Sequence, residues 1–217
     1  MRYFAAMELK TTLQTFRFGE YQFNAFVPEP LALQQTFAKQ VETDPLAQAP
    51  YWAQVWSAAY ALCHFLATEP EYIKDKKLME LAAGLGLPSF LAAQIACSVI
   101  CSDISIDAVA IMQRSIDQNE FSNCKAMVLD WNNLPNDLSA DVILLSDINY
   151  QPQEFETLYK VIHQFTLQSC TIILSAPQRL MAKPFIERLE KFIVHRNTVT
   201  ITELQPTTDC SVFVLKR

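Results

Sequence analysis

The sequence predicts an α/β domain in which helices cover both faces of a mostly parallel, seven-stranded sheet. From residue 78 to residue 192, short apolar runs of strand length alternate with helical patterns of apolar residues. Repeated strand–helix–strand order of this kind implies parallel strands joined by helices. The last two apolar runs are separated only by the turn region 205–209, so we expect them to form an antiparallel hairpin at the sheet edge.

The individual elements follow from local patterns. The expected strands are residues 78–82, 99–102, 125–129, 141–146, 171–176, 194–203 and 211–216. Apolar residues at steps of three and four predict helices between these strands, over residues 88–96, 105–119, 152–167 and 183–192. Ser105 is a suitable N-cap for the second of these helices. The same spacing from Trp52 through Trp56 to Leu66 predicts a further helix before the first strand.

A small β-hairpin is expected near the N-terminus, over residues 11–27. Two runs rich in β-forming residues flank the pair that begins with Gly19, and such a pair is typical of a tight turn. Phe16 and Phe18 are expected on one face of this hairpin and Phe23 on another.

The chain is long enough for one large domain with a small addition. We therefore divide it into an N-terminal hairpin and cap segment, residues 1–50, and a main domain, residues 51–217. A short helix is expected over residues 31–41. We expect the hairpin and residues 28–50 to cap a cleft of the main domain and to set selectivity, because functional selectivity is often carried by such segments.

Composition argues against several classes of protein. The net charge is −6 and the longest basic cluster, Lys74 to Lys77, is short and interrupted by Asp75, so a nucleic-acid partner is not expected. No membrane span is expected, because apolar runs of roughly 18 residues are missing. A signal peptide is not expected either, because the first ten residues lack a long apolar region followed by a cleavage site. The six cysteines are scattered without a CxxC pair, which argues against a metal site and indicates a reducing, cytoplasmic location. The oligomeric state stays open.

Two motifs point to a cofactor site at the carboxyl ends of the first two strands. The segment from Glu80 to Ser89 runs from a buried strand through Gly84 and Gly86 into a helix, and glycines there let the backbone approach a ligand closely. Asp103 ends the next strand, where a carboxylate can accept hydrogen bonds from both hydroxyls of a ribose. By position alone, these motifs fit a dinucleotide or a methyl donor.

Two further motifs end later strands. Asp130 and Trp131 follow the third strand, where an acid can accept a hydrogen bond from an adenine amino group and an indole can cover the ring. Packing in the core is an equally good explanation for Trp131. The fourth strand delivers Ser146, Asp147 and Tyr150 into the same region, and the latter two are candidates to orient a nucleophile.

Taken in order, these motifs resemble the class I methyltransferases. More narrowly, they resemble the family that includes nicotinamide N-methyltransferase-like bacterial proteins and METTL21-type lysine methyltransferases. The resemblance covers about residues 50–192, and its marks are PYWAQVWSAAYALCHFL at 50–66, MELAAGLGLPS at 79–89, Asp103, Gln118-Asn119, LDW at 129–131, LLSDINY at 144–150 and QRLMAKPFIERL at 178–189. It implies a Rossmann-like sandwich and S-adenosyl-L-methionine as cofactor.

The resemblance also implies residue roles. Residues implied to bind the cofactor are Trp56, Glu80, Ala82, Ala83, Gly84, Gly86, Asp103, Ile104, Asp130, Trp131 and Ser146. Asp147 and Tyr150 match the acceptor-side DxxY element, and the hypothesis is that they shape the acceptor pocket without a covalent intermediate. The expected reaction is N-methylation of a protein lysine or of a small amine. Arg179 follows the fifth strand near this cleft and is interpreted as a surface residue.

This sequence departs from the family at two positions, and alternatives stay open. Ala82 stands where the family usually has a glycine, and Pro88 follows Gly86-Leu87. The added methyl group of Ala82 keeps a non-catalytic binding module of the same fold in consideration. A NAD-dependent oxidoreductase is a second alternative, although Ser89 replaces the third fingerprint glycine. A nucleic-acid amino-methyltransferase is a third, although the tetrad at 147–150 differs from its motif and no basic groove is expected.

Overall fold

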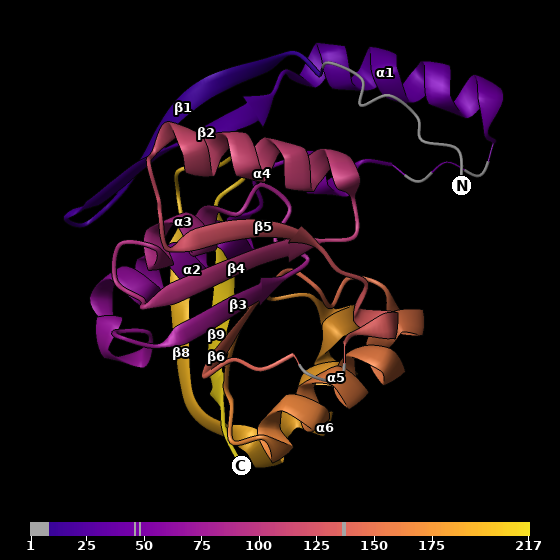
Figure 1. Cartoon of the computed structure of the whole chain (residues 1–217). Coiled ribbons are helices and arrows are strands. Elements are labelled where there is room, and N and C mark those ends of the chain that lie inside the picture. Colours follow the sequence, from indigo (N-terminus) through magenta and orange to yellow (C-terminus); the bar gives the residue numbers. More distant parts are fainter. Residues whose placement is uncertain (1–8, 46, 48, 136–137) are drawn as a thin grey trace.

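The main sheet has seven strands in the order β5-β4-β3-β6-β7-β9-β8 (Figure 1). The structure is a computed structural model that describes residues 9–45, 47, 49–135 and 138–217. The strands are β3 Lys77–Leu81, β4 Ser98–Asp103, β5 Cys124–Val128, β6 Val142–Ser146, β7 Thr171–Pro177, β8 Ile193–Ile201 and β9 Thr208–Leu215. The first five are parallel, and β9 runs antiparallel to both β7 and β8. The predicted sheet and its antiparallel hairpin are therefore confirmed.

The strand order reverses between β3 and β6. The chain proceeds outward from β3 to β4 and β5, then returns to place β6 on the other side of β3. In open parallel sheets the loops at the carboxyl ends of the strands diverge at such a point and leave a crevice. The topology therefore fixes where a ligand site is expected.

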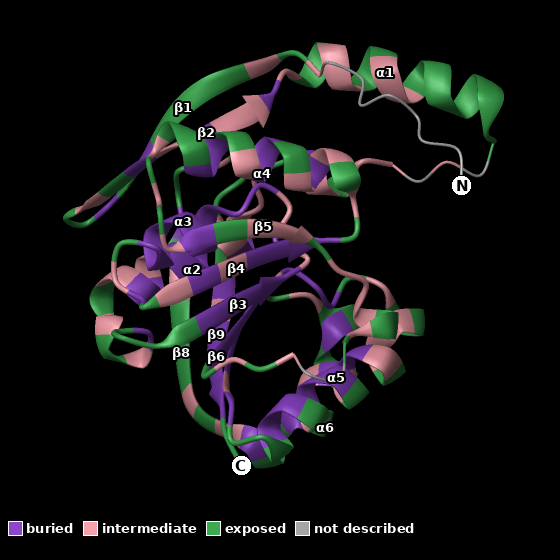
Figure 2. Cartoon of the chain, viewed as in Figure 1, coloured by how far each residue is buried: buried purple, intermediate pink, exposed green. Residues whose placement is uncertain are grey.

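Helices cover both faces of the sheet (Figures 1 and 2). One face carries α2 Ser57–Thr68, α3 Leu87–Ala92 and α4 Ile106–Gln118, and the other carries α5 Phe155–Leu167 and α6 Lys183–Leu189. Each face has its own core, since successive strand residues point to opposite sides: Leu78 packs into the first core and Met79 into the second. This alternation also turns Glu80 toward the side of α3.

The N-terminal hairpin consists of β1 Thr11–Phe18 and β2 Tyr21–Pro28, as expected. The prediction that Phe23 lies on a different face from Phe16 is wrong. The two residues are direct partners across the antiparallel pair, with ring centroids 5.8 Å apart, and directly opposed residues share a face. Both rings are buried in the first core, so the hairpin packs against the helices of that face.

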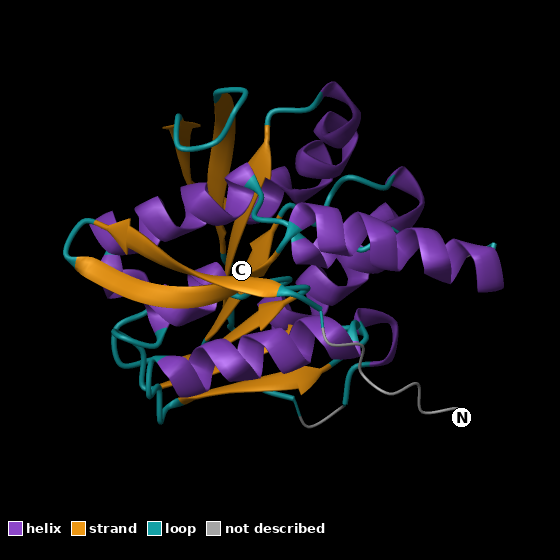
Figure 3. Cartoon of the chain, turned by 90° about the horizontal axis from the view of Figure 1, so that it is seen from above, coloured by secondary structure: helices purple, strands orange, loops and turns teal. Residues whose placement is uncertain are grey.

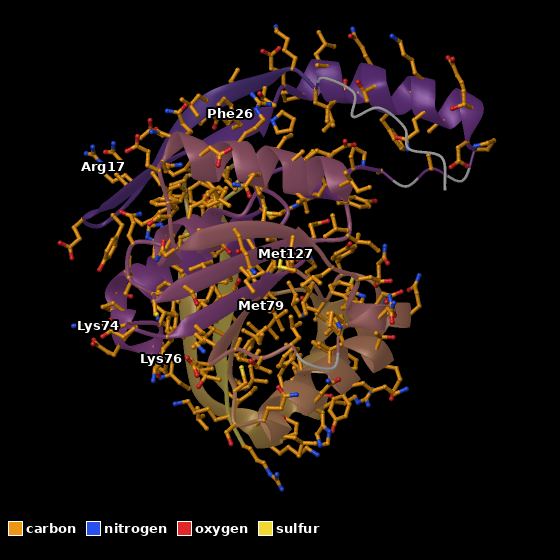
Figure 4. All side chains as sticks on the ribbon, viewed as in Figure 1. Arg17, Phe26, Lys74, Lys76, Met79 and Met127 are labelled. Carbon is orange, nitrogen blue, oxygen red and sulfur yellow. The ribbon has the colours of Figure 1, made fainter. Side chains whose placement is uncertain are left out.

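Hydrogen bonds also join the hairpin to α4. The backbone N–H of Phe26 donates to Ser115 Oγ at 3.0 Å, and that of Asn24 donates to Asn119 Oδ1 at 2.8 Å. Arg114 lies over the ring of Phe26, which Figure 4 labels, at 4.3 Å from its centroid. The hairpin thus continues the packing of the main domain, while the division of the chain at residue 50 stays a prediction.

Helix α1, Pro30–Thr43, contains the helix predicted over residues 31–41. None of its residues is buried, and it extends outward from the end of the hairpin (Figures 2 and 3). Pro30 at its first turn suits a helix start, because the missing N–H would have no partner there.

Two helix boundaries differ most from the sequence-based prediction. The helix predicted from Trp52 begins only at Ser57, because a 3₁₀ turn at Tyr51–Ala53 is followed by extended backbone up to Trp56. The helix predicted over residues 88–96 ends at Ala92, where the chain turns back toward the sheet. By contrast, Ser105 caps α4 as predicted: its Oγ accepts a hydrogen bond from the N–H of Ala108 at 3.3 Å.

Candidate active site

A cavity of about 730 Å³ opens at the carboxyl ends of β3, β4, β5 and β6, where the strand order reverses. Its volume lies within the range of roughly 300–1,000 Å³ that small-molecule and cofactor sites occupy. The loop that follows each of these strands contributes to the wall, namely residues 82–87, 103–107, 129–132 and 146–151. All four predicted motifs therefore meet at one cavity.

The loop after β3 has a backbone that favours glycine. Gly84 and Gly86 have φ values of +57° and +75°, and Ala82 has a φ of +52°. A Cβ atom at Gly84 would lie 3.0 Å from the carbonyl oxygen of Trp52. The glycines are therefore required by both conformation and space, and Ala82 adopts the strained left-handed conformation in which a glycine would be unstrained.

Asp103 braces this loop from the end of β4. Its Oδ2 accepts a hydrogen bond from the N–H of Gly84, and its Oδ1 accepts one from the N–H of Ser105, both at 2.9 Å. Burial raises the pKa of Asp103, and the backbone N–H groups oppose that rise. Each carboxylate oxygen has a second acceptor position. Asp103 can therefore hold the loop and still accept hydrogen bonds from a ligand in the cavity.

Glu80 lies beneath the loop and does not line the cavity. Its Oε2 accepts hydrogen bonds from the N–H and the Oγ of Ser89, at 3.0 and 2.6 Å, so it satisfies a free donor at the start of α3. Its Oε1 is buried without a partner among the described residues. Burial raises the pKa of Glu80 to about 8, so the side chain carries a proton at neutral pH.

Asp130 and Trp131 line the cavity after β5. Asp130 Oδ1 accepts hydrogen bonds from the backbone N–H and the side-chain amide of Asn132, at 2.9 and 3.0 Å. Trp131 is half-buried and packs against the second core on one side. Both explanations considered for Trp131 therefore have a structural basis, since one residue contributes to the core and to the cavity wall.

Asp147 pairs with Arg179, which corrects the interpretation of Arg179 as a surface residue. The guanidinium donates two parallel hydrogen bonds to the carboxylate, the one from Nη2 to Oδ2 measuring 3.0 Å. The Asp147 side chain is 8% exposed and that of Arg179 is 32% exposed. Asp147 itself has a φ of +52°. The carboxylate is therefore held firmly at the cavity wall, with one lone pair on each oxygen left for a ligand.

Three aromatic side chains cluster beside Asp147. The ring of Tyr51 lies 5.8 Å from that of Tyr150 and 6.4 Å from that of Trp56. The indole N–H of Trp56 donates to the carbonyl oxygen of Tyr51 at 2.9 Å, which fixes the orientation of the indole. Burial, and next the charge of Asp147, raise the pKa of Tyr150, so its hydroxyl stays protonated and can donate a hydrogen bond.

The structure brings every predicted site residue except Glu80 to this cavity. The residues that line it are Trp56, Ala82, Ala83, Gly84, Gly86, Asp103, Ile104, Asp130, Trp131, Ser146, Asp147 and Tyr150. Sequence reasoning missed Tyr51 and the contribution of individual residues of α1. Leu33, Phe37 and Gln40 of that helix also line the cavity, at steps of four and three that could have identified the face.

The cavity is acidic. Its charged lining, among the described residues, consists of one guanidinium, Arg179, and the carboxylates of Asp103, Asp107, Asp130, Asp147 and Glu154. The basic cluster noted in the sequence lies elsewhere: Figure 4 shows Lys74 and Lys76 beside the start of β3, at the opposite end of the strand from the cavity. The negative potential of the carboxylates in the cavity favours ligands with positive charge.

Comparison with known proteins places this arrangement in context. Residues 47–192 match a family model described as lysine methyltransferase. The chain is 27% identical over 156 residues to the mouse histone-arginine methyltransferase METTL23, and the match covers 69% of this chain and 58% of that protein. It is 28% identical over 131 residues to the protein N-lysine methyltransferase METTL21A of Xenopus tropicalis, covering 58% and 61%. The chain thus spans less than two thirds of these relatives.

Solved structures with low sequence identity share the fold. The Thermus thermophilus 16S rRNA N2 G1207 methyltransferase RsmC, solved with AdoMet and guanosine, superimposes with a TM-score of 0.63 at 16% identity, covering 97% of this chain and 51% of that one. The putative RNA methyltransferase PH1948 of Pyrococcus horikoshii gives a TM-score of 0.60 at 18% identity, covering 76% and 88%. The predicted Rossmann-like methyltransferase sandwich is therefore confirmed.

Proposed function

The chain belongs to the lysine methyltransferase family, whose model matches residues 47–192, and from this premise we propose that it transfers a methyl group from S-adenosyl-L-methionine to a basic side chain of a protein. One observation carries the proposal. A single acidic cavity combines the left-handed loop at residues 82–86, the carboxylate of Asp103 and the carboxylate of Asp147. The same cavity can therefore hold a cationic cofactor and a cationic acceptor.

The residues of the cavity suit the cofactor. Gly84 has no side chain, and a Cβ atom there would lie 3.0 Å from the Trp52 carbonyl oxygen, so glycine keeps the loop in this conformation at the cavity wall. We assign Asp103 to the ribose hydroxyls, Asp130 and Trp131 to the adenine, and the loop residues Ala82 to Gly86 to the methionine part, with Ile104 and Ser146 completing the wall. Glu80 acts from beneath, by holding the start of α3.

When bound, S-adenosyl-L-methionine would supply a methyl group on a sulfonium sulfur. An acceptor nitrogen that has first released a proton to water would form the N–C bond with its lone pair as the C–S bond breaks and S-adenosylhomocysteine leaves. The chain contributes position rather than a nucleophile of its own. We assign to Asp147 the task of accepting a hydrogen bond from the acceptor nitrogen, because Arg179 fixes the carboxylate and leaves a free lone pair on each oxygen. The Tyr150 hydroxyl, which stays protonated, donates to the acceptor or to water. The aromatic rings beside it favour a cation.

The charge of the cavity suits a basic protein side chain and a small amine equally, and the names of the relatives favour the protein acceptor. Family membership disfavours an oxidoreductase, and the retention of Gly84, Asp103 and Asp147 in one cavity favours catalysis over a non-catalytic module. Both lysine and arginine side chains are cationic, and both occur among the names of the matched proteins. We place lysine first, because the family model carries that description.

The test is methylation of peptides by the purified chain with isotopically labelled donor, read by mass spectrometry. Asp147→Asn should bind S-adenosylhomocysteine normally and lose at least about tenfold in turnover, the size typical of a lost charge-assisted hydrogen bond. Asp107→Asn removes the same charge from the same cavity and should keep most of the turnover. Full turnover in Asp147→Asn would show that the assigned role is wrong.

The proposed location is the cytoplasm, as the sequence indicates. All six cysteines are free, which fits a reducing compartment. Separately, no helix among the residues that the structure describes is long and apolar enough to cross a membrane.

A further inference from the structure

A second cavity, of about 200 Å³, adjoins the first and shares Arg179 with it. It lies between the end of β7, strand β9 and the start of α6. Its wall is formed by Asn149, Ala176, Pro177, Gln178, Arg179, Ala182, Lys183, Ile186, Ser211 and Phe213. None of the roles assigned above to the cofactor or to the methylated side chain uses this space.

The two cavities have opposite charge. The charged side chains that line the second cavity, within the described part of the chain, are the cations Arg179 and Lys183, whereas the first cavity is rich in carboxylates. Arg179 already pairs with Asp147. Lys183 is 71% exposed and, among the residues that the structure describes, pairs only with Glu187 one turn away, at 3.8 Å, a type of surface pair worth little. Its ammonium is therefore available to an anion.

An unsatisfied amide lies in the wall of the same cavity. Asn149 is 1% exposed, and neither its Oδ1 nor its Nδ2 has a hydrogen-bond partner within the described residues. A buried polar group without a partner costs about 1–3 kcal/mol. A carboxylate that enters the cavity would pair with Lys183, and a rotation of the Asn149 side chain toward the cavity would let Nδ2 donate to it and remove part of this cost. The apolar wall around them, which includes Ile186 and Phe213, suits the methylene groups of an acidic side chain.

We propose that the second cavity binds an acidic side chain of the acceptor protein, close in sequence to the methylated residue. The inference rests on the proposed function, which assigns only the methylated side chain, and adds a second residue of the acceptor. Because Arg179 borders both cavities, an acceptor segment can place its basic residue against Asp147 and its acidic residue against Lys183 at the same time. Recognition is thus strengthened by an acidic residue at one fixed position relative to the methylated residue.

The experiment uses nonapeptides with a central lysine or arginine and otherwise neutral residues, in which glutamate is moved through the positions on either side. Each has a twin with glutamine in the same place. At the favoured position, the glutamate peptide should show a KM about threefold to tenfold lower than its glutamine twin, as expected for a partly desolvated ion pair. Lys183→Glu should abolish this preference and favour lysine at that position.

Lys160→Glu is the matched control. Lys160 is 73% exposed and meets Glu156 one turn away at 3.9 Å, like Lys183 with Glu187, but it lines neither cavity. This variant should keep the glutamate preference of the parent. Equal KM values for the glutamate and glutamine peptides at every position, or equal effects of Lys183→Glu and Lys160→Glu, would overturn the proposal.

A binding readout separates failure of this inference from failure of the proposed function. Fluorescence anisotropy of labelled peptides in the presence of S-adenosylhomocysteine reports the glutamate preference without turnover. A preference in binding that Lys183→Glu removes would support the second cavity even if no peptide were methylated. Methylation without any such preference would support the function and overturn the inference. No binding of any peptide would overturn both the inference and the acceptor class.

Discussion

The ion pair between Asp147 and Arg179 should respond asymmetrically to removal of either partner. Arg179→Met leaves a carboxylate that is 8% exposed without the two hydrogen bonds that stabilise it. Breaking a buried pair in this way costs about 3–5 kcal/mol. Since Arg179 is 32% exposed, solvent screens the pair, and we expect a loss of about 2–3 kcal/mol in the free energy of unfolding.

Asp147→Asn should cost much less, about 1 kcal/mol or below. The asparagine keeps an oxygen that can accept a hydrogen bond from Arg179, and asparagine tolerates a φ of +52° better than most residues. The partly exposed guanidinium can turn to water. In the double variant, the loss should be smaller than in Arg179→Met alone, because no buried charge is left without a partner.

Urea denaturation followed by circular dichroism measures these differences, and thermal denaturation provides a second reading. For a chain of this length, about 1 kcal/mol corresponds to a shift of roughly 2–4 °C in Tm. The reasoning would be refuted if Asp147→Asn were as destabilising as Arg179→Met, or if the double variant lost the sum of the two single losses. Either result would mean that the carboxylate is not the buried charge of the pair.

Three further predictions concern the loop, the pH dependence and the hairpin. Burial raises the pKa of Glu80 from 4.5 to about 8. The stability that protonated Glu80 contributes below pH 4.5 should therefore be lost at about 1.4 kcal/mol per pH unit as the pH rises to about 8. Urea unfolding at several pH values measures this slope, and Glu80→Gln should remove it. Gly84→Ala should weaken S-adenosylhomocysteine binding at least about tenfold in calorimetry, because the new Cβ would meet the Trp52 carbonyl. Gly19 has a similar positive φ but open space around its Cβ position, so Gly19→Ala should lose only about 1 kcal/mol of stability and no affinity. Phe23→Ala should cost about 3–5 kcal/mol in denaturant unfolding, since its ring is fully buried between the hairpin and α3; a loss below 1 kcal/mol would show that the hairpin is dispensable for the core.

Much of the fold could be predicted from the sequence because the apolar pattern and the strand order carry it. One error in a helix boundary occurred where apolar residues serve the cavity rather than a helix. Trp52, Val55 and Trp56 have helical spacing, yet they line the cavity from a 3₁₀ turn and an extended segment, so that α2 starts only at Ser57. Periodicity alone cannot distinguish a helix face from a loop that packs on the same side.

The site was predicted in outline but not in its contacts. Asp103 and Asp147 could be assigned from their places at strand ends, since the topology brings the ends of parallel strands together. The pairing of Asp147 with Arg179 joins residues 32 positions apart in sequence, and no local pattern reveals it. Likewise, the sequence identifies Ala82 as a departure from the family, but only the backbone shows that its φ is positive. Long-range geometry decides both features.

The central claim is that the acidic cavity at the strand ends binds the methyl donor through Asp103 and the loop at residues 82–86. Calorimetric titration with S-adenosylhomocysteine, with NAD(H) as a parallel ligand, tests it most directly. The account predicts saturable binding of S-adenosylhomocysteine alone, at least about tenfold weaker binding in Asp103→Asn, and unchanged binding in Lys183→Glu. Binding of NAD(H) instead, or S-adenosylhomocysteine binding that Asp103→Asn leaves intact, would contradict it.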